Sequence, residues 1–449
     1  MKKLTFAVIL AACSFLFGEA YQVNTLSARQ LGMAHTGAGL KLGSESMHFN
    51  PGALGFLDSK FDASGGVTMI IPKVQFWGVN GHATPENNPS TPVYFYAAGN
   101  IKRLISLGLS FTTPYGNSAS WDKNWEGAGL IQDISLKVFA LQPTFAVNIL
   151  DKVSVGAGPT INFGNFEQSK QLAPIKSLEA YRPLAYYDSD VGQILDRNKD
   201  GVNLELSGKA DVAVGVNAGI LFEAIKDKLA FGVSYRSGVK AKVSKGDAKI
   251  AAGNDIDSLN RIISRINSSS PEPAAPNIPP ELTMFNSKTF EAELPLPANM
   301  NVGVSFRPVE KLLLDFDLQW VNWGAYDKLN LVFHNITTVV NPKKYENTFA
   351  YRLGTQIGLH EKFDLRFGIY YDQTPVPDDF LNPETPSTNK LGVTTGGSFR
   401  PVEMLSIDFA FLYSHGFNRD GSCPNPPGRF SGGYKVEAFV PSIGLSFKF

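Results

Sequence analysis

Hydrophobic and polar residues alternate along many segments of this chain. Between residues 153 and 163 every odd position is apolar, and every even position is small or polar. The same period of two recurs in 314–320, 363–371, 407–413 and 439–449. Successive side chains of a β-strand point to opposite faces, so this period predicts strands with one apolar and one polar face. If every alternating segment is a strand, the chain has about fourteen of them.

The connections between these strands fall into two length classes. Tight turns are expected near residues 101–104, 149–152, 224–228, 308–311, 360–363 and 401–404. Long connections lie between them, at 73–92, 114–133, 168–200, 251–282, 335–346, 377–388 and 418–433. A soluble β-sandwich also alternates, but short turns at one rim and long loops at the other are typical of outer-membrane barrels. We therefore expect an all-β fold, a transmembrane antiparallel β-barrel of about 14 strands.

The charged residues agree with a position in a membrane. In the alternating segments acids and bases lie on the polar face, as Asp315 and Asp317 do beside Leu314 and Phe316. A charge on the lipid-facing side near the bilayer midplane would cost about 2 to 4 kcal/mol. Aromatic residues near strand ends predict two interfacial girdles. The candidates are Trp320, Trp323, Tyr370 and Tyr371 at the long-loop end, and Phe447 and Phe449 at the short-turn rim.

Composition narrows the classes further. The 449 residues carry a formal net charge of +0, which does not suggest nucleic acid as a partner. Mean hydropathy is -0.08. After the first twenty residues no apolar run approaches the length of about eighteen residues that a transmembrane helix needs. The chain is therefore either soluble or a β-barrel.

Residues 1–20 have the features of a secretory signal peptide. Two lysines precede an apolar core, and residues 18–20 form a small-x-small cleavage site, so we expect cleavage before Tyr21. Lipidation at Cys13 is the less favoured alternative, because the apolar core before it would be very short. After removal of the leader, Cys423 is the only cysteine, which excludes an intramolecular disulfide.

Residues 21–58 are predicted to form a hatch, or plug, inside the barrel. The segment is rich in glycine and lacks the sustained alternation of the wall. A barrel of about fourteen strands is too wide for wall side chains to fill, so it must hold a plug or an open channel. Residues 59–449 then form the transmembrane β-barrel with long extracellular loops. For Asn50-Pro51-Gly52 a simple turn before the first strand is the alternative.

A series of short motifs spans the mature chain. They are Leu31-Gly32-Met33-Ala34, Phe49-Asn50-Pro51-Gly52-Ala53-Leu54, Thr113-Pro114-Tyr115-Gly116 with Trp125, Gln142-Pro143-Thr144-Phe145-Ala146, Val153-Ser154-Val155-Gly156-Ala157-Gly158, Leu296-Pro297-Ala298 with Gly303, 317–323, Tyr351-Arg352-Leu353-Gly354, Arg366-Phe367-Gly368 and Pro375-Val376-Pro377-Asp378. In this order they resemble the FadL-type long-chain fatty acid transporters of Gram-negative outer membranes. The resemblance implies a fourteen-stranded barrel closed by an N-terminal hatch that carries an Asn-Pro-Ala sequence. Here Asn50 and Pro51 match, Gly52 takes the third position and Ala53 follows.

The same resemblance implies an outer-membrane channel for passive uptake of hydrophobic compounds, either long-chain fatty acids or aromatic or aliphatic hydrocarbons. The implied steps are capture in a groove between extracellular loops, transfer to an apolar pocket in the lumen, rearrangement of the hatch, and lateral exit through a gap at a kinked strand. Asn50, Pro51, Gly52 and Ala53 are the expected hatch residues. Gly108 in the third strand is the candidate for the wall kink, with a packing glycine as the alternative.

The two longest loops supply candidate ligand contacts. Apolar residues recur at helical spacing in 255–268, and others lie in 168–200. The expected ligand-binding residues are Leu172, Ile175, Leu178, Tyr181, Ile256, Leu259, Ile263 and Ile266. The alternative is that these side chains only pack the loops on each other. Candidates for binding a carboxylate head group are Lys170, Lys176, Arg261 and Arg265.

Other chemistry has little support in the sequence. Asp196-x-Asn198-x-Asp200-Gly201 begins like a calcium loop, but Ser207 stands where a bidentate glutamate is needed. The histidines lack zinc-ligand spacing, and no nucleophile elbow is present. We expect no metal, no cofactor and no enzymatic activity. The alternatives are a porin-like pore for polar solutes and an outer-membrane hydrolase that would use His334 or His415 near a long-loop end.

These predictions place the protein in the cell outer membrane as a multi-pass β-barrel. Its expected partners are hydrophobic small molecules, fatty acids or hydrocarbons, together with outer-membrane lipids and lipopolysaccharide. No nucleic acid is expected to bind, and a monomer is expected.

Overall fold

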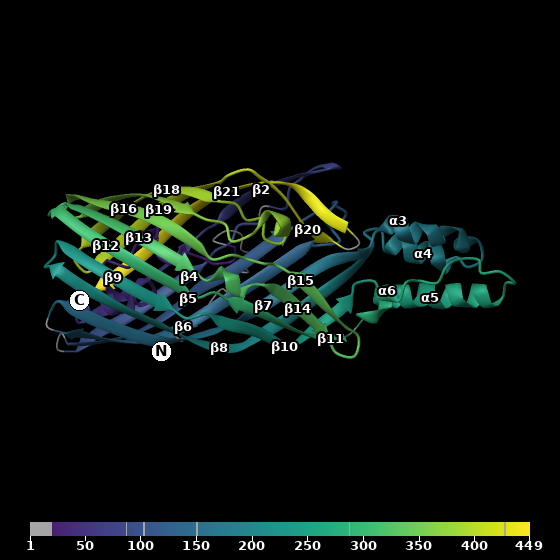
Figure 1. The fold of residues 1–449 in the computed structure, drawn as a ribbon, viewed down its shortest axis with the longest axis horizontal. Coiled ribbons are helices and arrows are strands. Elements are labelled where there is room, and N and C mark those ends of the chain that lie inside the picture. The colour runs from purple at the N-terminus through teal and green to yellow at the C-terminus, as the bar shows by residue number, and fades with distance from the viewer. Residues whose placement is uncertain (1–19, 87, 102–103, 150, 287, 426–427) are drawn as a thin grey trace, which may run out of the picture.

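The barrel dominates the structure (Figure 1). The computed structural model describes residues 20–449 except 87, 102–103, 150, 287 and 426–427, so the predicted signal peptide up to residue 19 lies outside the described residues. Within the described residues one sheet contains 21 strands, of which fourteen form the closed wall. The wall strands are β1 (Phe61–Thr68), β4 (Val93–Ile101), β5 (Ile105–Ser120), β6 (Asp133–Ile149), β7 (Val153–Ala173), β8 (Val202–Ile225), β9 (Leu229–Arg236), β12 (Asn299–Val309), β13 (Leu312–Val321), β16 (Thr348–His360), β17 (Phe363–Asp372), β18 (Lys390–Val402), β19 (Leu405–Gly416) and β21 (Gly428–Lys448).

Antiparallel pairing closes the wall. Each wall strand pairs with the next in chain order, and β21 returns to pair with β1, with Gly66 opposite Gly444. Closure removes the edge strands that would expose unpaired backbone groups to lipid. The predicted antiparallel barrel is therefore confirmed. The short turns, such as 226–228 and 361–362, all lie at one rim, as the connection lengths predicted.

The long-loop end carries additional strands and helices. The additional strands are β2 (Ile71–Gly78), β3 (Gly81–Ala83), β10 (Val239–Ile250), β11 (Lys288–Leu296), β14 (Lys328–Phe333), β15 (Thr337–Pro342) and β20 (Arg419–Asn425). Parts of the predicted loops are therefore strands that extend the sheet beyond the wall. The short helices η4 (Trp323–Ala325) and η5 (Asp378–Phe380) lie in other connections at this end.

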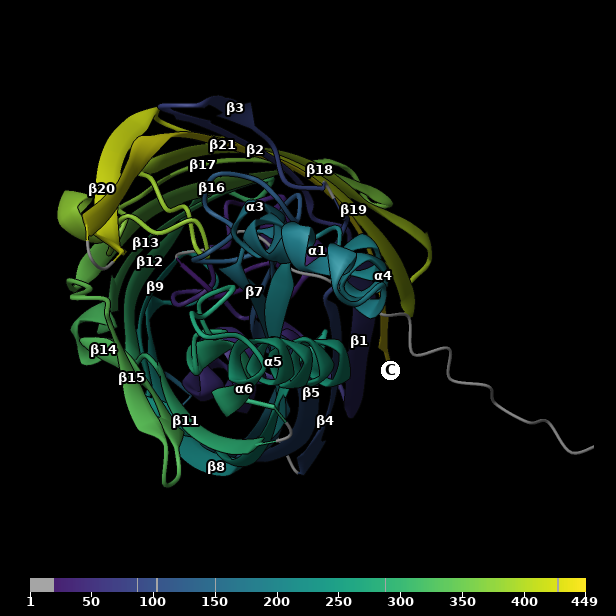
Figure 2. The same cartoon turned by 90° about the vertical axis from the view of Figure 1, so that its right-hand side faces the viewer.

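A group of helices stands beyond the barrel mouth, and we call it the helical cap. It consists of α3 (Ile175–Leu178), η3 (Glu179–Tyr186), α4 (Asp190–Arg197), α5 (Gly253–Ser268) and α6 (Glu281–Met284). Figure 1 shows the cap at the right-hand end, and Figure 2 looks down on it in front of the ring of strands. Among the described residues, the structure contains no helix both long and apolar enough to cross a bilayer.

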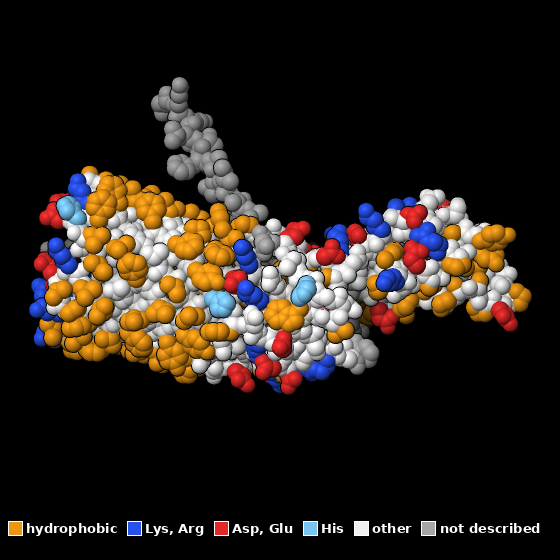
Figure 3. All heavy atoms as spheres, turned by 90° about the horizontal axis from the view of Figure 1, so that it is seen from above, with side chains coloured by type: hydrophobic (Ala, Val, Ile, Leu, Met, Phe, Trp, Pro, Cys, Tyr) orange, Lys and Arg blue, Asp and Glu red, His pale blue; other side chains and the backbone are white. Residues whose placement is uncertain are grey.

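The alternating residues face the two sides as predicted. Outward-facing side chains with at least 37% exposure include Leu314, Phe316, Phe367, Ile369, Phe409, Phe411, Leu445 and Phe447. The acids between them, Asp315 and Asp317, are buried inside the barrel. Figure 3 shows hydrophobic side chains over the side of the barrel, with charged side chains at the short-turn rim and on the cap. The wall therefore has an apolar exterior and a polar interior at this height.

The predicted aromatic girdle at the long-loop end is wrong for two residues. Trp323 is fully buried, and its ring contacts Tyr21 edge-on at 4.7 Å between centroids. Tyr370 is also buried, because it belongs to the inward-facing set of β17, and its hydroxyl donates to Ser414 Oγ at 3.2 Å. Trp323 lies beyond the end of β13, where the alternation no longer fixes the side that a residue faces.

The segment before β1 lies inside the barrel, as Figure 2 shows for α1 within the ring of strands. Its elements are α1 (Ala28–Leu31), η1 (Gly43–Glu45), α2 (Ser46–Phe49) and η2 (Pro51–Phe56). Almost all of its residues are buried. Short helices suit this position because a helix satisfies its own backbone, whereas the wall strands are already paired with each other.

Candidate transport site

An apolar cavity lies in the barrel on the cap side of the hatch. Ile134, Leu136 and Val138 of β6 line one side of it. The other sides are formed by Gly164, Asn165 and Phe166 of β7, Ala210 of β8, Ala241 and Val243 of β10, and Ala292 and Leu294 of β11. Apart from the exposed Asn165, most of these residues occupy inward positions of strands whose outward neighbours are polar or charged, such as Lys137 and Lys242. The cavity is therefore a place for a hydrophobic molecule, built from the inner faces of the upper strands.

One end of the cavity is polar but has its charge neutralised. Glu384 reaches this end, accepts a hydrogen bond from Gln168 Nε2 at 2.8 Å and forms an ion pair with Lys343. Burial lowers the pKa of the Lys343 ammonium, but the Glu384 carboxylate raises it more, and the pKa lies above its usual value. Asn117 Nδ2 donates to the Glu384 carbonyl at 2.8 Å. The Glu384 carboxylate is therefore neutralised by Lys343 and hydrogen-bonded to Gln168.

Tyr21 forms the floor of the cavity. Its ring contacts Trp323, and its hydroxyl donates to the Pro295 carbonyl. The backbone of the same segment lies along the free edge of β5: Gly116 N donates to the Tyr21 carbonyl at 2.8 Å, and Val23 N donates to the Pro114 carbonyl at 2.9 Å. The start of the hatch therefore separates the cavity from the rest of the lumen.

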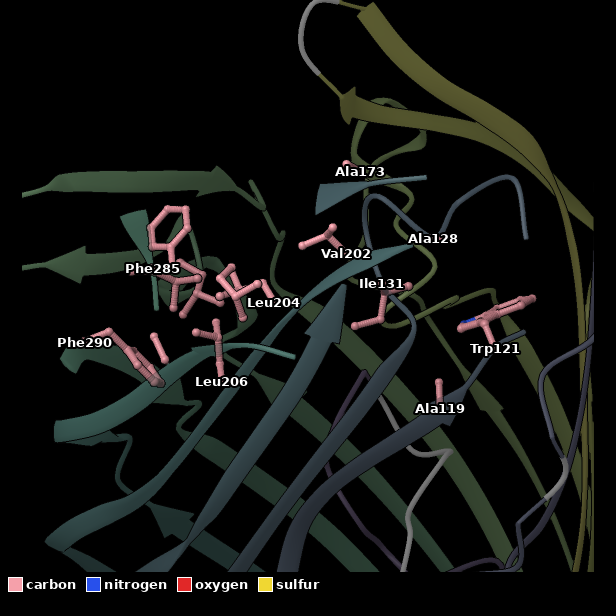
Figure 4. Close-up of a cluster of buried hydrophobic side chains, with 14 of the residues drawn as sticks. Ala119, Trp121, Ala128, Ile131, Ala173, Val202, Leu204, Leu206, Phe285 and Phe290 are labelled. Atoms are coloured by element: carbon pink, nitrogen blue, oxygen red, sulfur yellow. The ribbon is translucent and has the colours of Figure 1, made fainter. Parts of the chain in front are cut away.

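Above the cavity the barrel mouth is also apolar. Figure 4 shows Leu204, Leu206, Phe285 and Phe290 gathered on one side of the mouth, with Trp121 on the other. The Trp121 ring also stacks on that of Trp125 at 4.1 Å between centroids. These side chains belong to one large buried hydrophobic cluster that extends into the helical cap. An apolar lining thus continues from the cap to the cavity.

Below the cavity the hatch fits against glycines of the wall. Three cross-strand glycine pairs face it: Gly156 with Gly219, Gly232 with Gly303, and Gly354 with Gly368. A Cβ on Gly232 would lie 1.7 Å from the Ala38 carbonyl oxygen, and one on Gly156 would lie 2.2 Å from that of Pro51. The contact is reciprocal, because a Cβ on Gly52 would lie 2.6 Å from the Gly219 carbonyl oxygen. This explains why glycine replaces the alanine of the expected Asn-Pro-Ala sequence.

Inward-facing polar side chains bind the hatch backbone. Asn50 is the hub: its Nδ2 donates to the Ala38 carbonyl at 2.7 Å and the Ile220 carbonyl at 3.0 Å, and its Oδ1 accepts from Gly52 N at 3.0 Å. Asp317 Oδ2 accepts from Gly37 N at 2.7 Å. Hydrogen bonds to buried carboxylates are among the stronger ones in proteins. The wall therefore holds the hatch by specific polar contacts as well as by shape.

The opposite side of the hatch opens into a charged cavity near the short-turn rim, which we call the vestibule. Its charged lining residues are Arg29, Lys41, Glu45, Asp58, Asp62, Arg366, Arg400, Glu403, Asp408 and Lys448. Arg366 Nη1 lies 3.0 Å from Asp408 Oδ1. The two ends of the lumen thus differ in chemistry, apolar on the cap side and charged on the other.

Comparison with known proteins agrees with this architecture. Residues 9–449 match the model of the family described as outer membrane protein transport protein (OMPP1/FadL/TodX). The chain belongs to this family. It is 22% identical over 438 residues to a long-chain fatty acid transport protein of Escherichia coli O6:H1, covering 92% of this chain and 91% of the relative.

Solved structures show the same fold. A FadL homologue of Pseudomonas aeruginosa superposes with a TM-score of 0.77 at 20% identity, over 96% of this chain and 100% of the other. The Pseudomonas putida toluene transporter TodX superposes with a TM-score of 0.65 at 16% identity, over 96% and 99%. Membership of this transport family places the protein in the outer membrane and among transport channels rather than enzymes.

Seven of the eight predicted ligand contacts lie in the helical cap, and the eighth, Leu172, lies at the upper end of β7. Leu178, Tyr181, Ile256, Leu259 and Ile263 are buried in the cap. Leu172, Ile175 and Ile266 pack against the same cluster while partly exposed. None of the eight lines the cavity. Their role in ligand capture stays a prediction, and packing of the cap accounts for their present contacts.

The predicted head-group cations also lie in or near the cap. Arg265 forms an ion pair with Asp188, and Lys170 is part of the upper end of β7. Lys176 is in α3, and Arg261 Nη2 donates to Ser258 Oγ at 3.0 Å. None of these four lines the cavity.

The wall around Gly108 is regular. Gly108 pairs with Ala98 of β4 and Thr144 of β6 in uninterrupted registers, and a Cβ there would lie 2.4 Å from Met47 Sδ of the hatch. The register of β5 shifts instead between Thr112 and Tyr115. The structure therefore places the irregularity of this strand at residues 113–114, beside the hatch segment that begins at Tyr21.

The residues considered for a hydrolase or a calcium site form ion pairs or hydrogen bonds with neighbouring side chains. His334 Nε2 lies 2.8 Å from Glu291 Oε1, and His415 Nδ1 lies 3.3 Å from Glu437 Oε1. Asp196 accepts from Arg182 at 3.0 Å. Within the described part of the chain, no three His, Cys, Asp or Glu residues are grouped as metal ligands would be.

The sequence reasoning missed the residues that line the cavity. Leu136, Val138, Ala241 and Val243 occupy inward positions, where the barrel pattern predicts polar side chains. The sequence does mark these residues by a reversed alternation. On β10, Lys240 and Lys242 face outward, whereas Ala241 and Val243 face the cavity.

Proposed function

We propose that the protein is a passive channel for hydrophobic compounds, either long-chain fatty acids or aromatic or aliphatic hydrocarbons. The observation that carries this proposal is the apolar cavity above a closed hatch, directly below an apolar mouth. Apolar surface leaves water with a gain of about 25 cal/mol per Å², so this path attracts a hydrophobic molecule without ATP or a metal. The names of two similar proteins, a long-chain fatty acid transport protein and a toluene transporter, support both ligand classes.

The contrast between the two cavities supports lateral exit. A hydrophobic molecule that continued along the axis would have to displace a hatch moulded to the wall and then enter the charged vestibule. The hatch contact beside the cavity is smaller, because only the backbone of residues 21–23 covers the edge of β5 at its register shift. Withdrawal of Tyr21 from this edge is the hatch rearrangement that we propose, followed by exit into the membrane there.

The cavity favours the uncharged part of a ligand. Among the described residues that line it, Glu384 is the only ionisable acid and no lysine or arginine contributes. A carboxylate placed in this cavity would meet another carboxylate without a free cation to neutralise it. The apolar lining therefore suits the hydrocarbon chain of a fatty acid, and the head group stays outside.

The test is uptake by cells in which this protein is the sole route. Leu136→Asn places an amide without a partner in the cavity wall, which costs about 1 to 3 kcal/mol when a hydrophobic ligand covers it. We expect uptake of radiolabelled oleate and toluene to fall about tenfold. Leu136→Met keeps the volume and the apolar surface, and it should transport like the natural protein.

Two results would contradict the proposal. One is unchanged uptake of both compounds by Leu136→Asn. The other is a steady ion conductance and sugar flux through the natural protein in planar bilayers, which would favour the porin-like alternative. The folded state of each variant is checked by its resistance to denaturation in detergent.

A further inference from the structure

The wall of the barrel has a seam without a ladder between β8 and β10. From the short turn upward β8 pairs with β9 as far as Asn217 opposite Arg236, and Ser237 N donates to the Val216 carbonyl at 2.8 Å. Pairing with β10 resumes only at Ser207 opposite Asp247. Between these points residues 208–215 and 238–246, all within the described part of the chain, have no register with each other.

Both strands are irregular along this seam. On β8 the register with β7 shifts between Ala210 and Ala213, and on β10 the register with β11 shifts between Val243 and Gly246. Bulges of this kind bend a strand and increase its twist. At its two ends the seam is narrow: a Cβ on Gly208 would lie 3.2 Å from Gly246 Cα, and one on Gly215 would lie 2.7 Å from Val239 Cγ1. The two strands therefore stay side by side, and between these glycines only the backbone ladder is missing.

Small side chains close the seam on the inside. Ala210, Ala241 and Val243 lie behind it, and the same three residues line the apolar cavity. On the outside one side-chain hydrogen bond crosses it, from Ser244 Oγ to Asp211 Oδ2. At the seam the apolar cavity is therefore separated from the exterior by two strands that no backbone ladder joins.

The seam opens at the upper edge of the lipid-facing belt. Outward-facing Val212 and Val214 on β8 are 65% and 64% exposed, more than most of the large apolar residues on the wall. On β10 the outward positions are Lys240 and Lys242, which form ion pairs with Glu293 and Glu291. One side of the seam thus suits hydrocarbon, and the other suits the head-group region. Unpaired backbone is tolerated at membrane depth only where it borders a cavity or protein, and here the cavity lies directly behind it.

We infer that the β8–β10 seam is a lateral port through which the hydrocarbon chain of a fatty acid dissolved in the outer leaflet enters the apolar cavity. The chain passes between Ala210 and Ala241, and the carboxylate stays outside at the level of Lys240 and Lys242. This arrangement gives a fatty acid a binding mode in a cavity that offers no cation to its head group. It rests on the proposed function, and it lies on a different strand pair from the proposed exit beside β5.

The experiment closes the port in the folded protein. Asp211→Cys with Ser244→Cys puts two outward-facing thiols across the seam, where the natural side chains already meet, in a chain that also carries Cys423→Ser. The matched control is Ile220→Cys with Val233→Cys, which are directly opposite each other in a continuous ladder and are 51% and 44% exposed. Each pair is joined by a short, reducible thiol crosslinker after reconstitution into phosphatidylethanolamine and phosphatidylglycerol vesicles.

The readout is labelling by photoreactive palmitate added to the vesicle lipid. With the diazirine at the tail end, we expect adducts on peptides containing Leu136 and Leu294; with the diazirine next to the carboxylate, we expect adducts at Val212 and Lys242. Crosslinking the seam should reduce the tail-end adducts by at least about fivefold, since the unpaired strands can no longer separate, and reduction should restore them. Crosslinking the control pair should leave them unchanged.

A phospholipid with the same diazirine at its tail end distinguishes the source of the chain. Labelling of the cavity by palmitate that is lost on crosslinking, with no labelling by the phospholipid, supports a port for free fatty acids. Cavity adducts that persist in the crosslinked seam, or equal labelling by the phospholipid, would overturn the proposal. Uptake in the Leu136→Asn test is independent of this result, so the channel function can hold even if the port fails.

Discussion

The two halves of the barrel have opposite polarity patterns. In the half near the short turns, the outward residues are apolar, such as Phe145 on β6, and the inward ones are polar, such as Gln142 and Thr144. In the half near the loops, the same strand places Leu136 and Val138 inside and Lys137 outside. The alternation therefore reverses along a single strand without a break in its period.

This reversal follows from what surrounds each half. The lower half stands in lipid and encloses the backbone of the hatch, which needs hydrogen-bond partners such as Asn50 and Asp317. The upper half begins at the upper edge of the lipid-facing belt, where outward lysines replace apolar residues, and it encloses an apolar cavity. A tightly fitted polar interior suits a closure, and an unfilled apolar interior suits a ligand. The lower half of the wall therefore holds the hatch that closes the lumen, and the upper half forms the candidate ligand cavity.

Gly232→Ala should have the largest effect among the substitutions that test this difference between the two halves. The new methyl group would lie 1.7 Å from the Ala38 carbonyl oxygen, which is backbone and cannot move without displacing the hatch. We expect a loss of about 3 kcal/mol or more in the free energy of unfolding, the upper end of the cost of overpacking. Denaturant unfolding measures the loss, and planar-bilayer conductance reports whether the hatch has left the lumen.

Gly65→Ala is the matched control for this substitution. Gly65 also lies in a wall strand, but a Cβ there would meet nothing nearer than 3.4 Å. Its stability and conductance should equal those of the natural protein. Equal stability of Gly232→Ala and Gly65→Ala would show that the hatch does not pack closely against the wall glycines.

An exchange on the outer face of β6 tests the reversal itself. Phe145 is 48% exposed on the lipid-facing half, so Phe145→Lys should cost about 2 kcal/mol, within the range for a lysine between the bilayer midplane and its interface. Lys137→Phe, on the same face of the same strand in the upper half, should change stability by no more than about 0.5 kcal/mol. Unfolding in detergent-free vesicles compares the two. Similar costs for both would mean that lipid covers both halves.

The barrel could be predicted from the sequence because each wall strand has one lipid-facing and one lumen-facing side, which gives a period of two in hydrophobicity. Lipid on one side fixes Phe316 and Phe367 outward, and the closed lumen fixes Asp315 and Arg366 inward. Turn lengths then give the strand order. The hatch was predictable as an interior segment, because glycines and broken alternation exclude it from the wall, although its wall contacts depend on glycines that no period marks.

The candidate site was less predictable. Helical spacing in 255–268 correctly indicates a helix with an apolar face, but spacing alone cannot say whether Leu259 packs against protein or binds a ligand. The cavity residues come from strands far apart in the chain, such as Leu136 and Leu294, and only the closed barrel brings them together. Trp323 was misplaced for a related reason, since a residue beyond a strand end has no fixed side.

The smallest expected effect concerns the seam through which the upper half borders the membrane. Ser244→Ala removes the side-chain hydrogen bond to Asp211 that crosses the seam on its exposed side, which is worth about 1 kcal/mol or less. If this bond keeps the port shut, cavity labelling by tail-end photoreactive palmitate should rise about twofold, while the unfolding midpoint stays the same. Ser207→Ala, an outward serine on the same strand where the ladder with Asp247 is intact, should label like the natural protein. Equal labelling by all three proteins would show that small side chains such as Ala210 and Ala241, and not the hydrogen bond, set the barrier at the seam.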